Sequence, residues 1–201
     1  MNPTKQTMAS ALLALVLLAA GGLAHAGARY HVALDSTGYH GGGALELTFL
    51  GLAGAAPAAA TASGFAGAFG TDGGEEGSVA GTFPGPLAFT NAGPNDFWRA
   101  VTLGGVFGFD VDFDLPAAPG SGTTFAVYLA DAAGYLTADA GPVARVDRAA
   151  GLDPVIGTEA AFASVTPMAA VPEPSSWALV AGGLALMGAL RRRARAARDL
   201  T

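Results

Sequence analysis

Three aspartates at alternate positions have the spacing that points most directly to chemistry. They occur as Asp110-x-Asp112-x-Asp114, and carboxylate oxygens are ligands that Ca²⁺ prefers. An EF-hand loop would also need Gly at its sixth position and Glu at its twelfth, where this chain has Leu115 and Ser121. The pattern therefore does not match an EF-hand, and a calcium site here would need further ligands.

Strand geometry favours a simpler interpretation of these aspartates. Alternate residues of one strand lie roughly 6.6–7 Å apart at Cα, whereas Ca²⁺ holds its oxygen ligands at about 2.4 Å. One ion would reach two such carboxylates only if their side chains leaned sharply together. We therefore expect Asp110, Asp112 and Asp114 to form a solvated acidic face, with no cofactor. The alternative is a calcium ion held with help from a neighbouring loop that carries Asp72, Glu75 and Glu76.

Other catalytic patterns are missing from the sequence. His31 and His40 are the histidines outside the N-terminal segment, and without cysteine they lack the further ligands that zinc prefers. No Gly-x-Ser-x-Gly elbow occurs. Gly41–Gly43 is not followed by the Lys and Ser or Thr of a phosphate loop, so we expect turn glycines. Paired carboxylates could serve a glycosidase, but any acidic chain supplies such pairs. We expect no enzymatic activity.

Three aromatic residues are expected to escape the hydrophobic core: Phe97, Trp98 and Tyr135. Exposed aromatic rings have an apolar face and, in Trp and Tyr, a polar group, so they can stack on sugar rings. Trp98 is the first candidate for such a glycan contact. The alternative is ordinary core packing, which is the commoner role of large aromatic side chains.

Period-two alternation predicts that Asp110, Asp112 and Asp114 lie on a strand. Every odd position from 107 to 115 is apolar and every even one is Gly or Asp, which is typical of a strand with one face on a core and one in water. Similar segments bounded by Gly, Pro, Asn or Asp occur at 30–34, 44–50, 78–83, 87–90 and 123–129. Residues 163–171 are either a last strand or a linker.

Strands at this spacing, with no long helix between them, favour an all-β fold, an antiparallel β-sandwich of jelly-roll type. The short Gly/Pro loop between 107–115 and 123–129 predicts that these two strands pair antiparallel. The alanine-rich residues 55–62 are of low complexity and are expected to form a flexible loop.

The charge of the central region excludes one class of partner. Residues 27–170 contain 4 basic and 14 acidic side chains, a net charge of −10 against −6 for the whole chain. An acidic, lysine-free surface argues against nucleic-acid binding, which needs cations to displace counterions. Because cysteine is absent, no disulfide contributes to stability, and the region is long enough for one domain with its own core.

The N-terminal residues 1–26 have the pattern of a signal peptide. Lys5 precedes an apolar run at 9–23, and small residues, Ala24 and Ala26, occupy the cleavage positions, which predicts a mature start at Gly27. The expected partners are the Sec translocon and signal peptidase. The alternative is an uncleaved N-terminal anchor.

The C-terminal residues 171–201 combine three features in a fixed order. Val171, Pro172, Glu173 and Pro174 come first, an uncharged run ending at Leu190 follows, and Arg191, Arg192, Arg193 and Arg195 come last. The run predicts a transmembrane helix at 175–190 whose arginines stay on the cytoplasmic side. The stretch from Trp177 to Leu190 spans about 21 Å at 1.5 Å per residue, short of the roughly 30 Å bilayer core. This favours a transient anchor over the alternative of a permanent one.

This order resembles the PEP-CTERM sorting domain of Gram-negative bacteria. The resemblance implies processing near Pro172–Pro174 by exosortase, a membrane transpeptidase-like protease. It also implies a host that produces exopolysaccharide and forms biofilms or flocs. The Tyr-x-Val-x-Leu-Asp segment at 30–35 is similar to the opening of other PEP-CTERM ectodomains, a likeness that implies no activity.

These observations predict three parts, a signal peptide (1–26), a β-sandwich ectodomain (27–170) and a sorting signal (171–201). The leading hypothesis is a non-enzymatic surface or matrix protein with a structural or adhesive role in biofilm. It would be anchored transiently in the inner membrane and then displayed at the cell surface or in the extracellular matrix, in contact with exopolysaccharide. The second hypothesis is a carbohydrate-binding module, and the third is an extracellular hydrolase.

Overall fold

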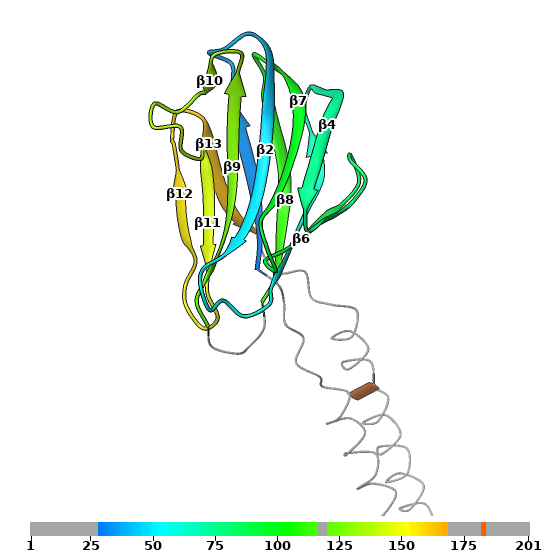
Figure 1. The fold of residues 1–201 in the computed structure, drawn as a ribbon, viewed down its shortest axis with the longest axis vertical. Helices are drawn as coiled ribbons and strands as arrows, with labels where there is room; N and C mark the ends of the chain where they lie inside the picture. Colours follow the sequence, from blue (N-terminus) through cyan, green and yellow to red (C-terminus); the bar gives the residue numbers. More distant parts are fainter. Residues whose placement is uncertain (1–27, 116–119, 169–181, 184–201) are drawn as a thin grey trace, which may run out of the picture. The chain divides into compact units, whose positions relative to one another are not determined.

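Two antiparallel sheets make up the central region of this protein in the computed structural model. The structure describes residues 28–115, 120–168 and 182–183, and every named element in them is a strand. In Figure 1 one sheet faces the viewer, and β13, β8 and β6 of the other lie behind it. The all-β, antiparallel prediction is therefore confirmed.

The sheet at the back, called sheet A, contains both the first and the last strand. In spatial order its strands are β13 (Ala163–Met168), β1 (Ala28–Asp35), β8 (Val106–Asp114), β3 (Ala59–Ala66), β6 (Leu87–Thr90) and β5 (Val79–Gly81).

The sheet at the front, called sheet B, carries the candidate site. In spatial order its strands are β12 (Val155–Thr158), β11 (Ala144–Arg148), β9 (Thr123–Asp131), β2 (Gly41–Gly51), β7 (Asn95–Leu103) and β4 (Phe69–Gly77). The short strand β10 (Gly134–Tyr135) folds back beside β9.

Alternating side chains give each strand one core face, as the sequence pattern predicts. On β8 the residues Phe107, Phe109, Val111 and Phe113 are all buried, while the positions between them are less covered. On β2, residues 45, 47 and 49 are buried in the same way. The two apolar faces form one continuous core between the sheets.

Phenylalanine rings connect the two sheets inside this core. Phe125 of β9 lies within 6.5 Å, between ring centroids, of Phe49 in its own sheet and of Phe89, Phe109 and Phe113 in sheet A. The pairs of Phe125 with Phe89 and with Phe113 are edge-to-face, a geometry that aromatic quadrupoles favour. The sheets are therefore packed through direct ring contacts.

The strand pairings are nested in sequence. Strand β1 pairs with β8, β2 pairs with β7, and β3 pairs with β6, all antiparallel. Each pair joins segments that lie far apart along the chain, so the ladders form only when distant parts meet. The strands alternate between the two sheets from β1 to β4.

One predicted pairing is wrong. Strands β8 and β9 follow each other in sequence but lie in different sheets. Both edges of β8 are occupied by β1 and β3, and both edges of β9 by β2 and β11. The chain between them therefore crosses from sheet A to sheet B instead of closing a hairpin.

Two loop assignments also differ from the structure. Part of the alanine-rich segment predicted as a flexible loop belongs to β3, where Ala60 and Ala62 are buried. Gly41–Gly43, expected in a turn, begins β2. A Cβ atom at Gly43 would lie 2.5 Å from the Ala130 carbonyl oxygen, so the neighbouring strand occupies that space. Small residues serve close packing here, and the sequence pattern alone does not distinguish this from a loop.

The two ends of the described region lie next to each other. Arg29 of β1 is the register partner of Met168 of β13, at the edge of sheet A. Over the ranges that the structure describes, we find no helix long and apolar enough to cross a membrane. The expected signal peptide, Pro-Glu-Pro segment and arginine cluster lie outside these ranges, as does all of the expected 175–190 helix except residues 182–183.

Candidate functional site

A row of large side chains crosses the outer face of sheet B. Glu46 of β2 is the register partner of Trp98 on β7 and of Tyr128 on β9. Register partners project from the same face of a sheet, and the flanking residues Leu45 and Leu47 point the other way into the core. Glu46 is therefore placed between two aromatic side chains on the face away from the core.

Tyr135 completes this group from the short strand β10. Its hydroxyl donates a hydrogen bond to Oε2 of Glu46 at 2.8 Å, and its ring centroid lies 5.4 Å from that of Tyr128. The hydrogen bond to the carboxylate, with burial as the next cause, raises the pKa of Tyr135 to about 12. Tyr135 therefore stays a protonated donor that holds the Glu46 carboxylate in place. We call Trp98, Tyr128, Tyr135 and Glu46 the aromatic face.

Trp98 is supported by a glycine of the next strand. Gly74 of β4 is its register partner, and a Cβ atom at Gly74 would lie 2.8 Å from Nε1 of the indole. The missing side chain leaves room for the indole over the β4 backbone. Trp98 remains 41% exposed, and Tyr135 is 43% exposed. The aromatic face thus offers accessible rings on a rigid sheet.

Asp96 and Glu76 add negative charge beside the aromatic face. They are register partners on β7 and β4, on the same side of sheet B as Trp98. Burial, followed by repulsion from Glu46 and Glu76, raises the pKa of Asp96. Its Oδ1 atom is buried and, among the described residues, has no hydrogen-bond partner. None of the ion pairs found in the described region involves these three carboxylates.

A hollow lies at the other end of the outer face of sheet B, away from the aromatic face. Thr124 of β9 pairs in register with Asp147 of β11, which pairs with Val155 of β12. The Thr124 hydroxyl donates to Asp147 at 2.7 Å, and Arg145 Nε lies 3.5 Å from the same carboxylate. Leu52 and Leu152 also line the hollow, whose volume is about 430 Å³. Arg145 and Asp147 pair with each other there, and the lining also includes Arg148 and Asp153.

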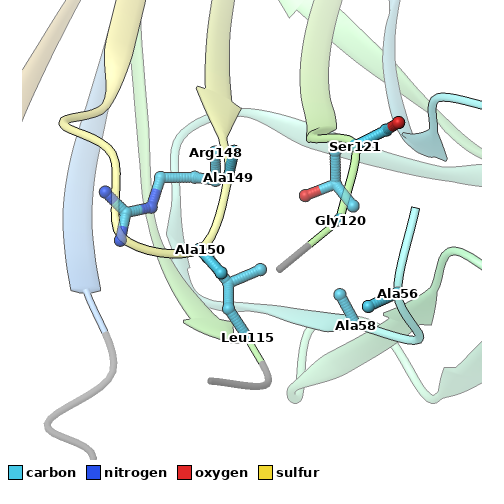
Figure 2. A pocket seen from close by; sticks show the side chains of 9 residues that line it. Ala56, Ala58, Leu115, Gly120, Ser121, Arg148, Ala149 and Ala150 are labelled. Atoms are coloured by element: carbon cyan, nitrogen blue, oxygen red, sulfur yellow. The ribbon is translucent and has the colours of Figure 1, made fainter. Parts of the chain in front are cut away.

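A much smaller cavity lies among the loops at the end of the sandwich (Figure 2). It is lined by Leu115, Ser121, Arg148 and small residues, and its volume of about 10 Å³ holds about one water molecule. Such a cavity has no room for a ligand of the size of a sugar.

The aspartates of β8 have cationic partners on the neighbouring strand. Asp110 is 2.9 Å from an Arg29 guanidinium nitrogen and 2.7 Å from Nδ1 of His31, and Arg29 Nε lies 3.6 Å from Asp112. Burial alone would raise the pKa of Asp110, but the hydrogen bonds to His31 and Arg29 lower it overall. Asp114, at the end of β8, is exposed.

These contacts refine the acidic face expected from the sequence, because its charge is partly neutralised by β1. In the described ranges, no group of three or more His, Cys, Asp or Glu side chains is arranged to hold a metal ion. The alternation of Arg29 and His31 with apolar residues is the signal that, with the β1–β8 register, would have located these pairs.

The three aromatic residues expected outside the core divide between the two faces of sheet B. Trp98 and Tyr135 are exposed as expected, but Phe97 is 2% exposed, so its prediction is wrong. Adjacent residues of a strand point to opposite faces, and Phe97 therefore enters the core when Trp98 leaves it. Sequence reasoning missed Glu46 and Tyr128, since only the strand register brings them beside Trp98.

The C-terminal segment carries the match to a known family. Residues 170–194 match the family model described as PEP-CTERM protein-sorting motif, which confirms the resemblance stated for the tail. The matched range contains the Pro-Glu-Pro tripeptide, the apolar run and the first arginines. No curated protein and no solved structure matches the chain.

The motif has direct implications for how the chain is exported and processed. It implies export, a membrane-anchored precursor, and exosortase as the processing partner. The chain therefore carries a PEP-CTERM protein-sorting motif at residues 170–194.

Proposed function

We propose that this protein is a non-enzymatic component of the cell surface or extracellular matrix of a Gram-negative bacterium, with a structural or adhesive role in biofilm exopolysaccharide. The observation that carries the proposal is the sorting motif at residues 170–194. The chain enters the inner membrane through the Sec translocon, loses residues 1–26 to signal peptidase, and is held by the 175–190 helix until exosortase acts near Pro172–Pro174.

The properties of the body support this proposal. The nested pairing of β1 with β8, β2 with β7 and β3 with β6 is the arrangement of a jelly roll, which presents two broad sheet faces. Residues 27–170 carry a net charge of −10, and they contain no cysteine whose oxidation state would matter outside the cell.

The mass of both termini of the native protein tests the proposal. Protein recovered from the cell surface and the medium should begin at Gly27 and end near Pro172–Pro174. A chain that still carries Arg191–Thr201 would mean a permanent membrane anchor and would contradict processing by exosortase. A chain that still carries residues 1–26 would contradict cleavage at Ala26.

A second candidate function is carbohydrate binding, which the aromatic face favours. Trp98 and Tyr135 are exposed rings on the outer face of sheet B, next to carboxylates that can accept hydrogen bonds from sugar hydroxyls. Retention of the full chain, solubilised in detergent, on host exopolysaccharide should disappear in Trp98→Ala. It should persist in Thr166→Ala, a control on the opposite sheet. Equal retention of both variants would contradict a role for this face.

The third hypothesis, an extracellular hydrolase, has no specific observation in its favour. A screen of glycoside and ester substrates with the full chain should be flat, and turnover lost in Glu46→Gln would contradict the non-enzymatic proposal. The proposal also includes no resident cofactor. A melting temperature that rises with calcium and falls with a chelator would contradict that part and would support the Asp110, Asp112 and Asp114 alternative.

A further inference from the structure

The charge of the aromatic face restricts what it can bind. Glu46, Asp96 and Glu76 lie close enough to one another to raise the pKa of Asp96, and they have no ion-pair partner in the described region. The cation nearest in sequence, Arg99, lies on the opposite side of β7 from Trp98. There its guanidinium stacks on Phe83 and donates to the Thr71 carbonyl. The rings are thus surrounded by uncompensated negative charge.

We propose that the aromatic face binds a polysaccharide that carries free amino groups, such as an N-deacetylated amino-sugar polymer. This inference rests on the second candidate function, carbohydrate binding, and names the chemical class of the ligand. The pyranose rings stack on Trp98 and Tyr135, and an ammonium group of the polymer lies among the carboxylates of Glu46 and Asp96.

The hydrogen-bonding capacity of these groups fits an ammonium ion. An ammonium has three donors and no acceptor. Glu46 uses Oε2 for Tyr135, and no hydrogen bond to its other oxygen is found in the described region. Asp96 is partly buried and lies close enough to Glu46 for their like charges to repel each other. An ammonium group would therefore donate to the free oxygen of Glu46 and would relieve this repulsion, and charge-assisted hydrogen bonds are stronger than neutral ones.

The same charges act against acidic polymers. A uronate carboxylate on the aromatic face would face Glu46 and Asp96 with no cation between them, and like charges that meet in an interface lower affinity. Neutral and N-acetylated sugars keep the stacking contribution and the hydrogen bonds from their hydroxyls but lack the ammonium contact. The expected order of affinity is therefore amino sugar, then neutral or N-acetylated sugar, then uronate.

Titration calorimetry with matched oligosaccharides tests the inference. The probes are glucosamine oligomers, N-acetylglucosamine oligomers of equal length and oligouronates, with the full chain in detergent at physiological ionic strength to screen long-range attraction. Glu46→Gln keeps an acceptor for Tyr135 but removes the charge. It should lower affinity for the glucosamine oligomer about tenfold and leave affinity for the N-acetylated oligomer unchanged. Asp96→Asn should have the same selectivity.

A charge-matched control separates site binding from attraction between a polycation and an acidic protein. Glu159→Gln removes one carboxylate that is exposed and lies after β12, and it should bind like the unmodified chain. An equal loss in Glu159→Gln and Glu46→Gln would overturn the inference.

The failure of the inference and the failure of carbohydrate binding are distinguishable. If Trp98→Ala abolishes binding of all sugars while Glu46→Gln changes nothing, the face binds carbohydrate without a preference for amino groups, and only the inference falls. If no oligomer binds the unmodified chain, both fall.

Discussion

Asp96 is a residue whose charge opposes folding. Its pKa is raised in the folded protein by burial and then by Glu46 and Glu76. A group with a raised folded pKa holds its proton more tightly when folded, so the folded state loses stability as pH rises through the window above the usual value of about 3.9. The carboxylate is therefore a cost at neutral pH, which is a common property of residues kept for binding.

We expect Asp96→Asn to stabilise the protein at pH 7. Because the side chain is partly solvated, screening should limit the gain to under about 1 kcal/mol. The gain should vanish below about pH 4, where Asp96 is protonated in both states. Thermal melts of both chains across this range test the expectation. A gain that persists in acid would have a cause other than charge.

Asn95 is a buried residue whose side-chain amide replaces backbone hydrogen bonds between β2 and β7. Its side chain accepts from the Phe49 N–H at 2.7 Å and donates to the carbonyl oxygens of Phe49 and Thr90. It is 4% exposed. The β2–β7 ladder has its last register pair at Leu47 and Phe97, so this amide supplies the hydrogen bonds that the backbone of β7 does not.

Asn95→Ala should therefore be strongly destabilising. The change leaves buried N–H and C=O groups of β2 without partners, and each such group costs about 1–3 kcal/mol, so we expect a loss of about 2–4 kcal/mol. Urea unfolding measures the loss. The control is Thr102→Ala, at an exposed position of the same strand, and it should change the free energy of unfolding by no more than about 0.5 kcal/mol. An equally small change in Asn95→Ala would contradict the role assigned to this amide.

At the scale of elements, charge pairing joins β1 to β8. Arg29 and His31 hold Asp110, and their hydrogen bonds lower its pKa against the effect of burial. A depressed folded pKa contributes stability above the unfolded value of about 3.9, and this stability is lost as pH falls through the lower folded pKa. The pairing therefore matters at neutral pH and disappears in acid.

Asp110→Asn should remove this contribution. We expect a loss of about 1 kcal/mol or less at pH 7, because the pair is partly exposed, and a smaller difference from the unmodified chain below about pH 4. Melting temperatures from pH 2 to 7 give the two curves. Parallel curves would show that Asp110 does not couple folding to pH.

Phe125 joins the two sheets, and its removal should cost more than any surface change. It contacts Phe49 on β2, Phe89 on β6, and Phe109 and Phe113 on β8. Truncation of a buried Phe to Ala typically costs about 3–5 kcal/mol. Urea unfolding of Phe125→Ala should show this loss, with Phe125→Leu intermediate. A cost below about 1 kcal/mol for Phe125→Ala would mean that the core collapses to fill the space.

The sequence predicted strands whose apolar residues alternate, such as β2, β8 and β9, and missed others, among them β3, β4, β7 and β11. Strand β8 was predicted because large apolar residues and aspartates alternate, whereas Ala60 and Ala62 of β3 have no such contrast. Strand β4 is rich in Gly and acidic residues, and its role under Trp98 becomes visible only in the structure.

The candidate site was predicted only in part, for a related reason. Trp98 was named from the sequence as a large aromatic expected at the surface, but Glu46 and Tyr128 come from strands far away in the chain. Their meeting depends on the exact register of three strands, which period-two patterns do not determine.

At the scale of the whole sandwich, the candidate binding surface and the first and last strands lie on different sheets. The aromatic face belongs to sheet B, while β1 and β13 are neighbours in sheet A. A ligand on sheet B would therefore not contact β1 or β13 from their own sheet. The apolar faces of the two sheets enclose one core between them.

The neighbouring ends also allow the order of the chain to be rearranged. Register partners in an antiparallel pair lie about 4.5–5.5 Å apart at Cα, and Arg29 and Met168 are such partners. A circular permutant of residues 28–168, closed by a short Gly/Ser linker and opened at the Gly104-Gly105 turn between β7 and β8, should keep the same β content by circular dichroism. Loss of that β content would show that the native order of β1 and β13 is needed for folding.

The pairing of Arg29 with Met168 has a consequence for ancestry as well as for engineering. A domain whose ends meet can be inserted into a loop of another protein without forcing the host's flanking residues apart. The sandwich is thus a self-contained domain, and the sorting motif that follows it is a separate segment. Recombination could join this sandwich to another sorting motif, or this sorting motif to another domain, without changing the fold of the sandwich.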